Sequence, residues 1–168
     1  PASPYPSNPS AVIRQGSEQW MDLDGSGRIE LVQLNGSMPG YYKRNWDNGA
    51  EWDSFRTFAS FPNLNLEDKR VKLVDLTGDG IADIVIANDE LLTIYRGLGD
   101  SGFGIPSYRQ TPMDDASGSR LVFWDGQEAI FTADMTGDGL TDLVRIRNSE
   151  VSYWPNLGYG KFDNKVIM

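Results

Sequence analysis

The chain has 168 residues, 39% of them apolar and 11% aromatic, which is enough to fill one core of ordinary domain size but not two independent ones. Its 15 basic and 24 acidic residues give a net charge of −9, so most of its surface would repel a nucleic-acid backbone or an anionic membrane. It has no cysteine and no histidine, which excludes disulfides, thiolate catalysis, Ser-His-Asp triads and histidine-based zinc sites. We therefore expect neither a nucleic-acid partner nor an enzyme.

The chain opens with PASPYPSNPS, which holds four of its nine prolines and cannot form a regular strand ladder. We expect residues 1–12 to form a linker or strap. No apolar stretch is long enough to cross a bilayer, so this segment is not expected to insert into a membrane. Because the chain starts without Met and without a leader-like pattern, we expect it to be a segment of a longer protein.

An acidic nine-residue loop occurs three times along the chain. It reads DLDGSGRIE from Asp22, DLTGDGIAD from Asp75 and DMTGDGLTD from Asp134. An apolar run follows each loop at once, and the loops start 53 and 59 residues apart. This period fits one unit of about four short strands, so the sequence predicts a repeat array.

The array divides into three repeats. Repeat 1 is predicted over residues 13–62, repeat 2 over 63–106 and repeat 3 over 121–168, with a Pro/Asp/Ser/Gly-rich surface loop over 107–120. Each repeat reads as an apolar strand, the acidic loop, an apolar strand, a turn, an aromatic strand and a glycine-rich turn, and no window has a helical period. The predicted fold class is all-β, with three propeller-type blades. Because a closed propeller needs at least four blades, we expect them to be part of a larger propeller.

The acidic loops have the residue types of an oxygen-ligated cation site. Acidic or hydroxyl side chains at positions 1, 3 and 5, the carbonyl of position 7 and a carboxylate at position 9 can surround one calcium ion. The candidate ligands are Asp22, Asp24, Ser26, Arg28 and Glu30 in the first loop; Asp75, Thr77, Asp79, Ile81 and Asp83 in the second; and Asp134, Thr136, Asp138, Leu140 and Asp142 in the third. Arg28, Ile81 and Leu140 would contribute their carbonyls. Gly27, Gly80 and Gly139 at position 6 are expected to have positive φ.

A second interpretation of the loops remains open. The aspartates can accept hydrogen bonds from backbone amides of their own turn, in which case the metal is optional or absent. Each loop has three carboxylates rather than four, so any calcium site is expected to be weak. The second and third loops are better calcium candidates than the first.

The aromatic residues fall into two groups. Tyr95 and Trp154 occupy equivalent strand positions and are expected in the core. Repeat 1 is degenerate, with an insertion around Trp46 and Trp52; these two residues and the nearby Tyr41 and Tyr42 are expected to form an exposed contact patch. The adjacent acids Asp114 and Asp115, in a polar loop, are expected to be solvated rather than catalytic.

Two stretches carry a family resemblance. The loops with their Gly-aromatic ends resemble the FG-GAP/VCBS blades of integrin-α-type propellers. The run AIFTADMTGDGLTDLVRIRNSEVSYWPNLGYGKFDNKV from Ala129 to Val166, together with KRVKLVDLTGDGIADIVI from Lys69 to Ile86, resembles the SpvB/TcB family, the B component of bacterial insecticidal toxin complexes. The likeness covers Lys69 to Met168; repeat 1 fits it loosely and the Pro-rich start does not fit.

The resemblance implies a secreted virulence protein with no active site in this segment. In such toxins the B component joins the C component in a hollow shell around a cytotoxic effector. A β-propeller of the B component docks on the pore-forming A component and gates the release of the effector. The implied partners are therefore the toxin A and C components. The alternative is a calcium-dependent adhesion or lectin-type FG-GAP module that binds glycan or protein.

Overall fold

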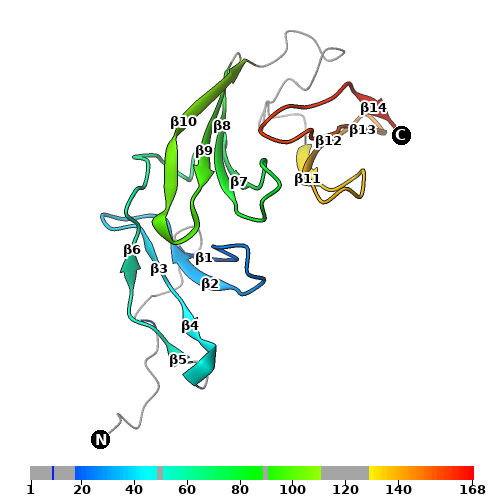
Figure 1. The fold of residues 1–168 in the computed structure, drawn as a ribbon. Helices are drawn as coiled ribbons and strands as arrows, with labels where there is room; N and C mark the ends of the chain where they lie inside the picture. Colours follow the sequence, from blue (N-terminus) through cyan, green and yellow to red (C-terminus); the bar gives the residue numbers. More distant parts are fainter. Residues whose placement is uncertain (1–8, 10–17, 49–50, 89–90, 111–128) are drawn as a thin grey trace, which may run out of the picture.

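The protein is all-β, as the sequence predicts. The structure, a computed structural model, describes residues 9, 18–48, 51–88, 91–110 and 129–168. The described strands form three four-stranded antiparallel sheets and one two-stranded hairpin (Figure 1). Two short 3-10 turns, η1 (Trp46–Asn48) and η2 (Gly99–Ser101), are the only helical elements in this part of the chain. No helix there is long and apolar enough to cross a bilayer.

Each four-stranded sheet has the strand order of a propeller blade. Blade 1 is β1 (Glu18–Met21), β2 (Glu30–Gln33), β3 (Gly40–Tyr42) and β6 (Arg56–Thr57). Blade 2 is β7 (Val71–Val74), β8 (Asp83–Ala87), β9 (Leu91–Gly97) and β10 (Phe103–Gln110). Blade 3 is β11 (Ala129–Ala133), β12 (Asp142–Arg147), β13 (Glu150–Trp154) and β14 (Val166–Ile167). The strands of each blade follow one another as a meander.

The acidic loop joins the first two strands of every blade. In blade 2, Val74 pairs with Asp83 at the base of the loop, and in blade 3 Ala133 pairs with Asp142. In blade 1 the corresponding pair is Met21 with Glu30. The position 9 carboxylate is therefore the first residue of the second strand in all three blades.

Consecutive blades pack face to face because apolar side chains lie on both faces of their strands. Val85, Leu92 and Ile94 of blade 2 pack with Leu143 and Trp154 of blade 3. On the other face of blade 2, Ile84 and Phe103 pack with Val32, Leu34 and Tyr41 of blade 1. The predicted core position of Trp154 is confirmed, and Tyr95 is half-buried against the core between blades 1 and 2.

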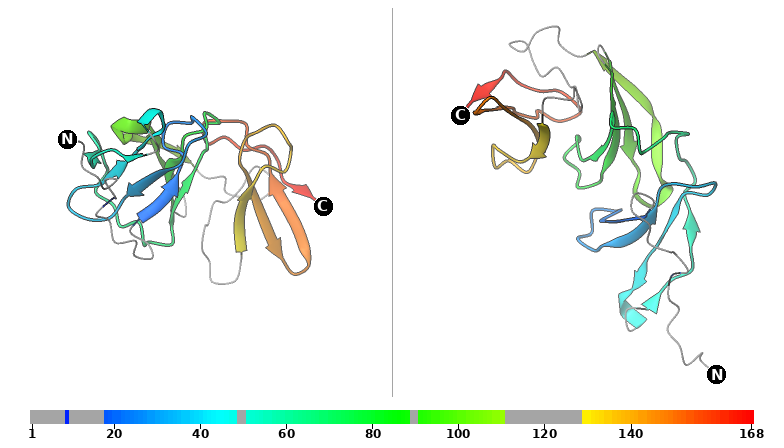
Figure 2. Two further views of the ribbon diagram at one scale, coloured as in Figure 1. Left: turned by 90° about the horizontal axis from the view of Figure 1, so that it is seen from below. Right: turned by 180° about the vertical axis from the view of Figure 1, so that it is seen from behind.

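The insertion in repeat 1 forms a hairpin, β4 (Arg44–Asn45) with β5 (Glu51–Trp52), on the side of blade 1 away from blade 2 (Figures 1 and 2). Trp52 of the hairpin lies with its ring centroid 5.8 Å from that of Trp20 on β1. Phe55, just after the hairpin, lies 5.0 Å from the ring of Tyr42. The hairpin and Phe55 thus cover part of the outer face of blade 1.

The expected exposure of the repeat 1 aromatics is correct for Trp46 and wrong for two tyrosines. Trp46 is 47% exposed and Trp52 half-buried, whereas Tyr41 is 3% and Tyr42 9% exposed. The reason is that both tyrosines lie on β3, an inner strand of blade 1. Tyr41 therefore faces the core shared with blade 2, and Tyr42 faces Phe55.

β10 extends into the segment where the sequence analysis placed a surface loop. It pairs with β9 as far as Gln110 opposite Leu91, although the loop was expected from residue 107. Pro106 is tolerated because β10 is an edge strand. Residues 1–8, 10–17 and 111–128, including most of the expected linker and surface loop and the acids Asp114 and Asp115, lie outside the described residues.

Candidate functional site

The first aspartate of each acidic loop accepts two backbone N–H groups of the same loop. Asp75 accepts the amides of Gly78 at 2.7 Å and Gly80 at 2.8 Å. The equivalent bonds in the third loop are Gly137 and Gly139 to Asp134. In the first loop Asp22 accepts the amides of Gly27 and of Ser26, which lies one position later than Gly78 does in its loop. The amides point inward because the glycines have positive φ; the expected values at Gly27, Gly80 and Gly139 are confirmed at 78°, 81° and 87°.

The position 9 carboxylate is a buried clamp. Asp83 has no exposed surface, and its two oxygens accept the amides of Leu76 at 3.1 Å and Gly97 at 2.9 Å. Leu76 lies in the loop and Gly97 at the end of β9, so one side chain ties three segments of the blade together. Burial raises the pKa of Asp83 above its ordinary value, while the two amide bonds act in the opposite direction.

Both hydrogen bonds recur in blade 3, and the bond to the loop amide recurs in blade 1. Asp142 is equally buried and accepts the amides of Met135 at 2.8 Å and Asn156 at 2.7 Å. Glu30 accepts the amide of Leu23 at 3.0 Å, and burial raises its pKa. These bonds give the acidic loops a role that needs no metal, which is the second interpretation left open by the sequence.

The side chains at positions 3 and 5 also bond within the loops. Asp79 accepts the amide of Ile81 at 3.0 Å and the guanidinium of Arg96 at 2.8 Å, and Asp138 accepts the amide of Leu140 at 2.8 Å. Further contacts at these positions are the Ser26 amide to Asp24 Oδ1 at 3.1 Å, Thr77 Oγ1 to Asp75, the Thr136 amide to Asp142, and the Arg28 amide to Ser26 Oγ.

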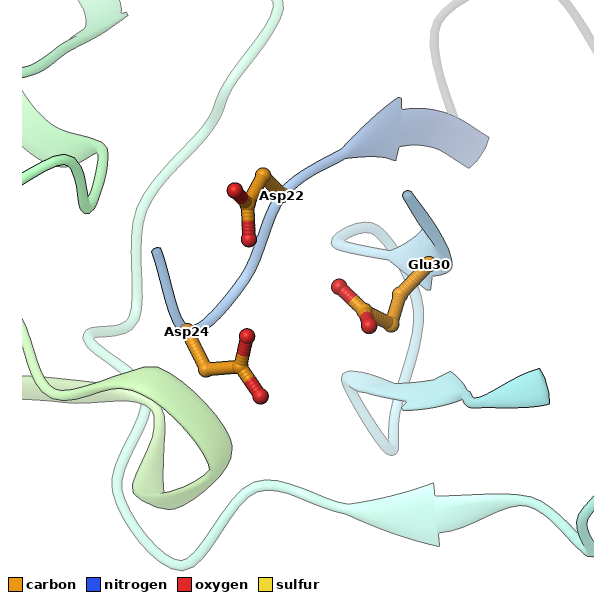
Figure 3. A group of neighbouring side chains, drawn as sticks. All are labelled: Asp22, Asp24 and Glu30. Carbon is orange, nitrogen blue, oxygen red and sulfur yellow. The ribbon is translucent and has the colours of Figure 1, made fainter. Parts of the chain in front are cut away.

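Carboxylates come closest together in the first loop. Asp22, Asp24 and Glu30 each have an oxygen within 4.8 Å of the others (Figure 3). In the part of the chain that the structure describes, neither of the other loops brings three carboxylates so close. The first loop therefore has the residue set that best fits an oxygen-ligated cation, although the sequence favoured the second and third.

A lysine ammonium already neutralises part of this cluster. Lys43 Nζ lies 2.6 Å from Asp24 Oδ2 and 2.7 Å from Asp100 Oδ1. The bond with Lys43 lowers the pKa of Asp24 to about 2, and the two carboxylates together raise the pKa of Lys43 against the effect of its burial. A calcium ion at this loop would have to share Asp24 with Lys43.

The three loops contact one another along one edge of the blades. A Cβ at Gly25 would lie 3.7 Å from Ile81 of the second loop, and a Cβ at Gly78 would overlap Leu140 of the third. The position 7 side chain of one loop thus packs on the position 4 glycine of the loop before it. A Cβ at Gly137, the position 4 glycine of the third loop, would meet no atom within 4 Å among the residues that the structure describes.

Asn156 is a structural residue that the sequence analysis missed. Its amide group is buried and donates to the carbonyls of Thr141 at 3.0 Å and Leu76 at 3.3 Å, so it links blade 3 to blade 2. The available signal was its position at the end of an aromatic strand, where blade 2 has Gly97.

A groove opens between blade 1 and the β4–β5 hairpin. Its volume is about 680 Å³, and we call it the tryptophan–arginine groove. It is lined by Trp20, Gly27, Arg28, Ile29, Arg44 and Trp46. Of these residues only Trp46 belongs to the aromatic patch that the sequence predicts.

Comparison with known proteins supports a repeat fold found in toxin complexes. Residues 75–144 match the FG-GAP-like repeat family. A Photorhabdus luminescens Tc holotoxin pore structure (mutation TccC3-D651A) matches 95% of this chain with a TM-score of 0.72 and 24% identity, over 7% of the toxin chain. A TcdB2-TccC3 structure matches 87% of this chain with a TM-score of 0.55 and 21% identity, again over 7% of that chain.

A fungal lectin has a related fold. A lectin of Agrocybe aegerita, described as recognising non-reducing terminal N-acetylglucosamine, matches 89% of this chain and 37% of its own, with a TM-score of 0.58 and 22% identity. No curated protein matches the sequence. The predicted FG-GAP resemblance is thus confirmed: the chain carries an FG-GAP-like repeat over residues 75–144, and as a whole it has the fold of a small segment of Tc toxin chains.

Proposed function

We propose that this chain is a non-enzymatic interaction segment of a toxin-complex B component, in which its blades dock on the pore-forming A component and contribute to the gate for effector release. The observation that carries the proposal is the match of nearly the whole chain to one part of a Tc holotoxin chain. The acidic loops support it, because their carboxylates bind backbone amides rather than converge on a reacting group. Secretion follows from this role.

The outer face of blade 3 supports a larger propeller. Ile146 on β12 is equivalent to Ala87 of blade 2, which is buried against blade 3, yet Ile146 is 48% exposed. Phe131 pairs with Val144 on the same face of blade 3 and is 51% exposed. Together with the open space at Gly137, this exposed apolar face fits a following blade of the same type.

The docking role is tested by binding to the purified pore-forming A component of a Tc complex. We expect the folded chain to bind the immobilised component in biolayer interferometry, and a heat-denatured sample of the same chain not to bind. Gating depends on docking, so no binding by a sample with an intact β-sheet circular dichroism spectrum would contradict the whole proposal.

A lectin-type role is the second candidate, and the fold shared with the Agrocybe aegerita lectin favours it. It predicts binding on a glycan array that is lost in chelator. Binding to the toxin component without binding to any glycan on the array would eliminate the lectin-type role.

We propose calcium as an optional ligand of the first loop, held by Asp22, Asp24 and Glu30. A cation that binds only the folded state adds about 2.7 kcal/mol of stability at a hundredfold excess over Kd. We expect millimolar calcium to raise the melting temperature relative to EDTA, and to raise it more in Lys43→Met, because the competing ammonium is then gone. An equal rise of the melting temperature in the parent and the variant would mean that calcium binds elsewhere. No rise in either would contradict calcium binding.

A further inference from the structure

We propose that the tryptophan–arginine groove of blade 1 is a docking site for a segment of a protein partner in which acidic side chains alternate with apolar ones. The proposal rests on the interaction role inferred above and names the surface and the chemistry through which a partner would be held. It concerns a groove that is separate from the carboxylate cluster of the first loop.

The groove is built by three segments that are far apart in the sequence. Trp20 comes from β1, Arg28 and Ile29 from the end of the first acidic loop just before β2, and Arg44 and Trp46 from the hairpin. Its volume of about 680 Å³ falls in the range of ligand-binding clefts. Trp20 is 53% exposed, so a large apolar surface is open to a partner.

Among the residues that the structure describes, the charged side chains that line the groove are Arg28 and Arg44. Arg44 lies with its guanidinium carbon 4.8 Å from the ring centroid of Trp52 and 5.8 Å from that of Trp46. Neither Arg28 nor Arg44 forms an ion pair with any residue that the structure describes, in a chain of net charge −9. The two indoles hold the Arg44 guanidinium in place and leave its N–H edge for a carboxylate.

In the described lining of the groove, the hydrogen-bonding side chains are all donors. Tryptophan and arginine side chains donate and do not accept, so a fitting ligand must present acceptors. A carboxylate only accepts, whereas each sugar hydroxyl also has a proton to donate. Arg44 already lies over one ring face of Trp46 and one of Trp52, so a sugar could not stack on those two faces. The groove chemistry therefore favours carboxylates over a neutral glycan.

The remaining lining favours a peptide. Ile29 and the indole of Trp20 are exposed apolar surfaces beside the two arginines, and tryptophan and arginine are the residues most enriched at protein-binding hot spots. Because the chain as a whole is acidic, an acidic segment is repelled elsewhere and attracted here, which gives the groove its selectivity.

The test uses the whole chain and a fluorescein-labelled short peptide of alternating Glu and Leu. We expect fluorescence anisotropy to report binding that weakens as salt is added. The matched peptide with Gln in place of every Glu should bind at least about tenfold more weakly, because it cannot form charged bonds with the arginines. Equal affinity for the two peptides would overturn the proposal, as would no binding of the acidic peptide.

Variants locate the binding. Arg44→Gln and Trp46→Ala should each lower the affinity for the acidic peptide by about tenfold. Arg109→Gln, which changes an exposed arginine on β10, should leave the affinity unchanged. Since Arg44 packs against two indoles, Arg28→Gln at the exposed loop tip is the second variant, and it should weaken binding severalfold with an unchanged melting temperature. Unchanged affinity in all three groove variants would overturn the proposal.

Other occupants give distinct results. Tighter binding of polygalacturonate than of the peptide would assign the groove to an acidic glycan, and self-association lost in Trp46→Ala would assign it to a second copy; either result overturns the proposal. If the pore-forming component binds the parent chain and Arg44→Gln equally well, the groove proposal fails while the proposed function stands. If peptide binding depends on the groove but the pore-forming component does not bind, the proposed function fails and the groove stands.

Discussion

At the scale of single residues, the carboxylates of the acidic loops act first as backbone acceptors. Asp83 and Asp142 are fully buried, and each holds an amide of its loop and an amide at the end of the third strand. A buried carboxylate is costly unless its oxygens are hydrogen-bonded, and here they are. The loops are therefore part of the scaffold whether or not a cation binds.

Asp83→Asn tests this role. The amide side chain keeps the shape but replaces one acceptor oxygen with a donor, so either the Leu76 or the Gly97 amide is left unsatisfied in the interior. We expect a loss of about 2 kcal/mol of unfolding free energy by urea denaturation in EDTA. Asp79→Asn, at a more exposed position paired with Arg96, should cost less than about 1 kcal/mol. Equal losses in the two variants would contradict the clamp.

The bond between Lys43 and Asp24 predicts a pH dependence. The pKa of Asp24 is lowered from 3.8 to about 2, so the bond stabilises the folded state above pH 4, and this stabilisation is lost as the pH falls from about 4 to about 2. Because the Asp24 side chain is 35% exposed, solvent screening limits the contribution to about 1 kcal/mol.

Lys43→Met should therefore be less stable than the parent at pH 6, and the difference should narrow by pH 3 in urea denaturation with EDTA. Lys161→Met is the control, because Lys161 is exposed and has no ion pair with a described residue. A difference that stays constant from pH 6 to pH 3 would contradict the assignment of the bond.

At the scale of elements, the blades are held together by repeated contacts between equivalent positions. A loop glycine receives an aliphatic side chain from the next loop at Gly25 and at Gly78, and the strands of consecutive blades share a core. The outer faces of the first and last blades differ in how far they are covered. The β4–β5 hairpin covers part of the outer face of blade 1, while the outer face of blade 3 exposes Phe131 and Ile146.

Two matched glycine substitutions test this contact. Gly78→Ala and Gly137→Ala both place a side chain at positive φ, which costs about 1 kcal/mol each. Gly78→Ala must also displace Leu140, so we expect it to lose about 1 kcal/mol more than Gly137→Ala in urea denaturation. Equal losses would mean that the second and third loops do not pack as described.

The elements that sequence could predict are those that repeat. The three loops, the positive φ of Gly80 and Gly139 and the core position of Trp154 follow from the period and from turn chemistry. Tyr41 and Tyr42 were misjudged because the insertion obscures the pattern of blade 1, so β3 was not recognised as an inner strand.

Contacts made only once in the molecule were beyond sequence reasoning. Lys43 bonds both to Asp24 of the first loop and to Asp100 of blade 2. Asn156 of blade 3 donates to the carbonyl of Leu76 in the neighbouring blade 2. The groove depends on how the hairpin folds over Trp20. Each of these contacts joins residues from different blades or segments, and no local pattern encodes them.

At the scale of the whole molecule, the fold separates a scaffold from a contact surface. Amide-bound carboxylates and two inter-blade cores hold the blades, and the groove at the covered end presents arginines and exposed tryptophans within an otherwise acidic chain. The apolar face at the other end fits another blade.

The most direct measurement of this account is hydrogen exchange by mass spectrometry, with and without the pore-forming A component. If the chain docks through blade 1, exchange should slow in peptides covering residues 18–30 and 40–48, while peptides covering 142–154 of blade 3 keep their rates. Unchanged exchange over the whole chain, at a component concentration well above that needed for the full toxin to assemble, would contradict the proposed role.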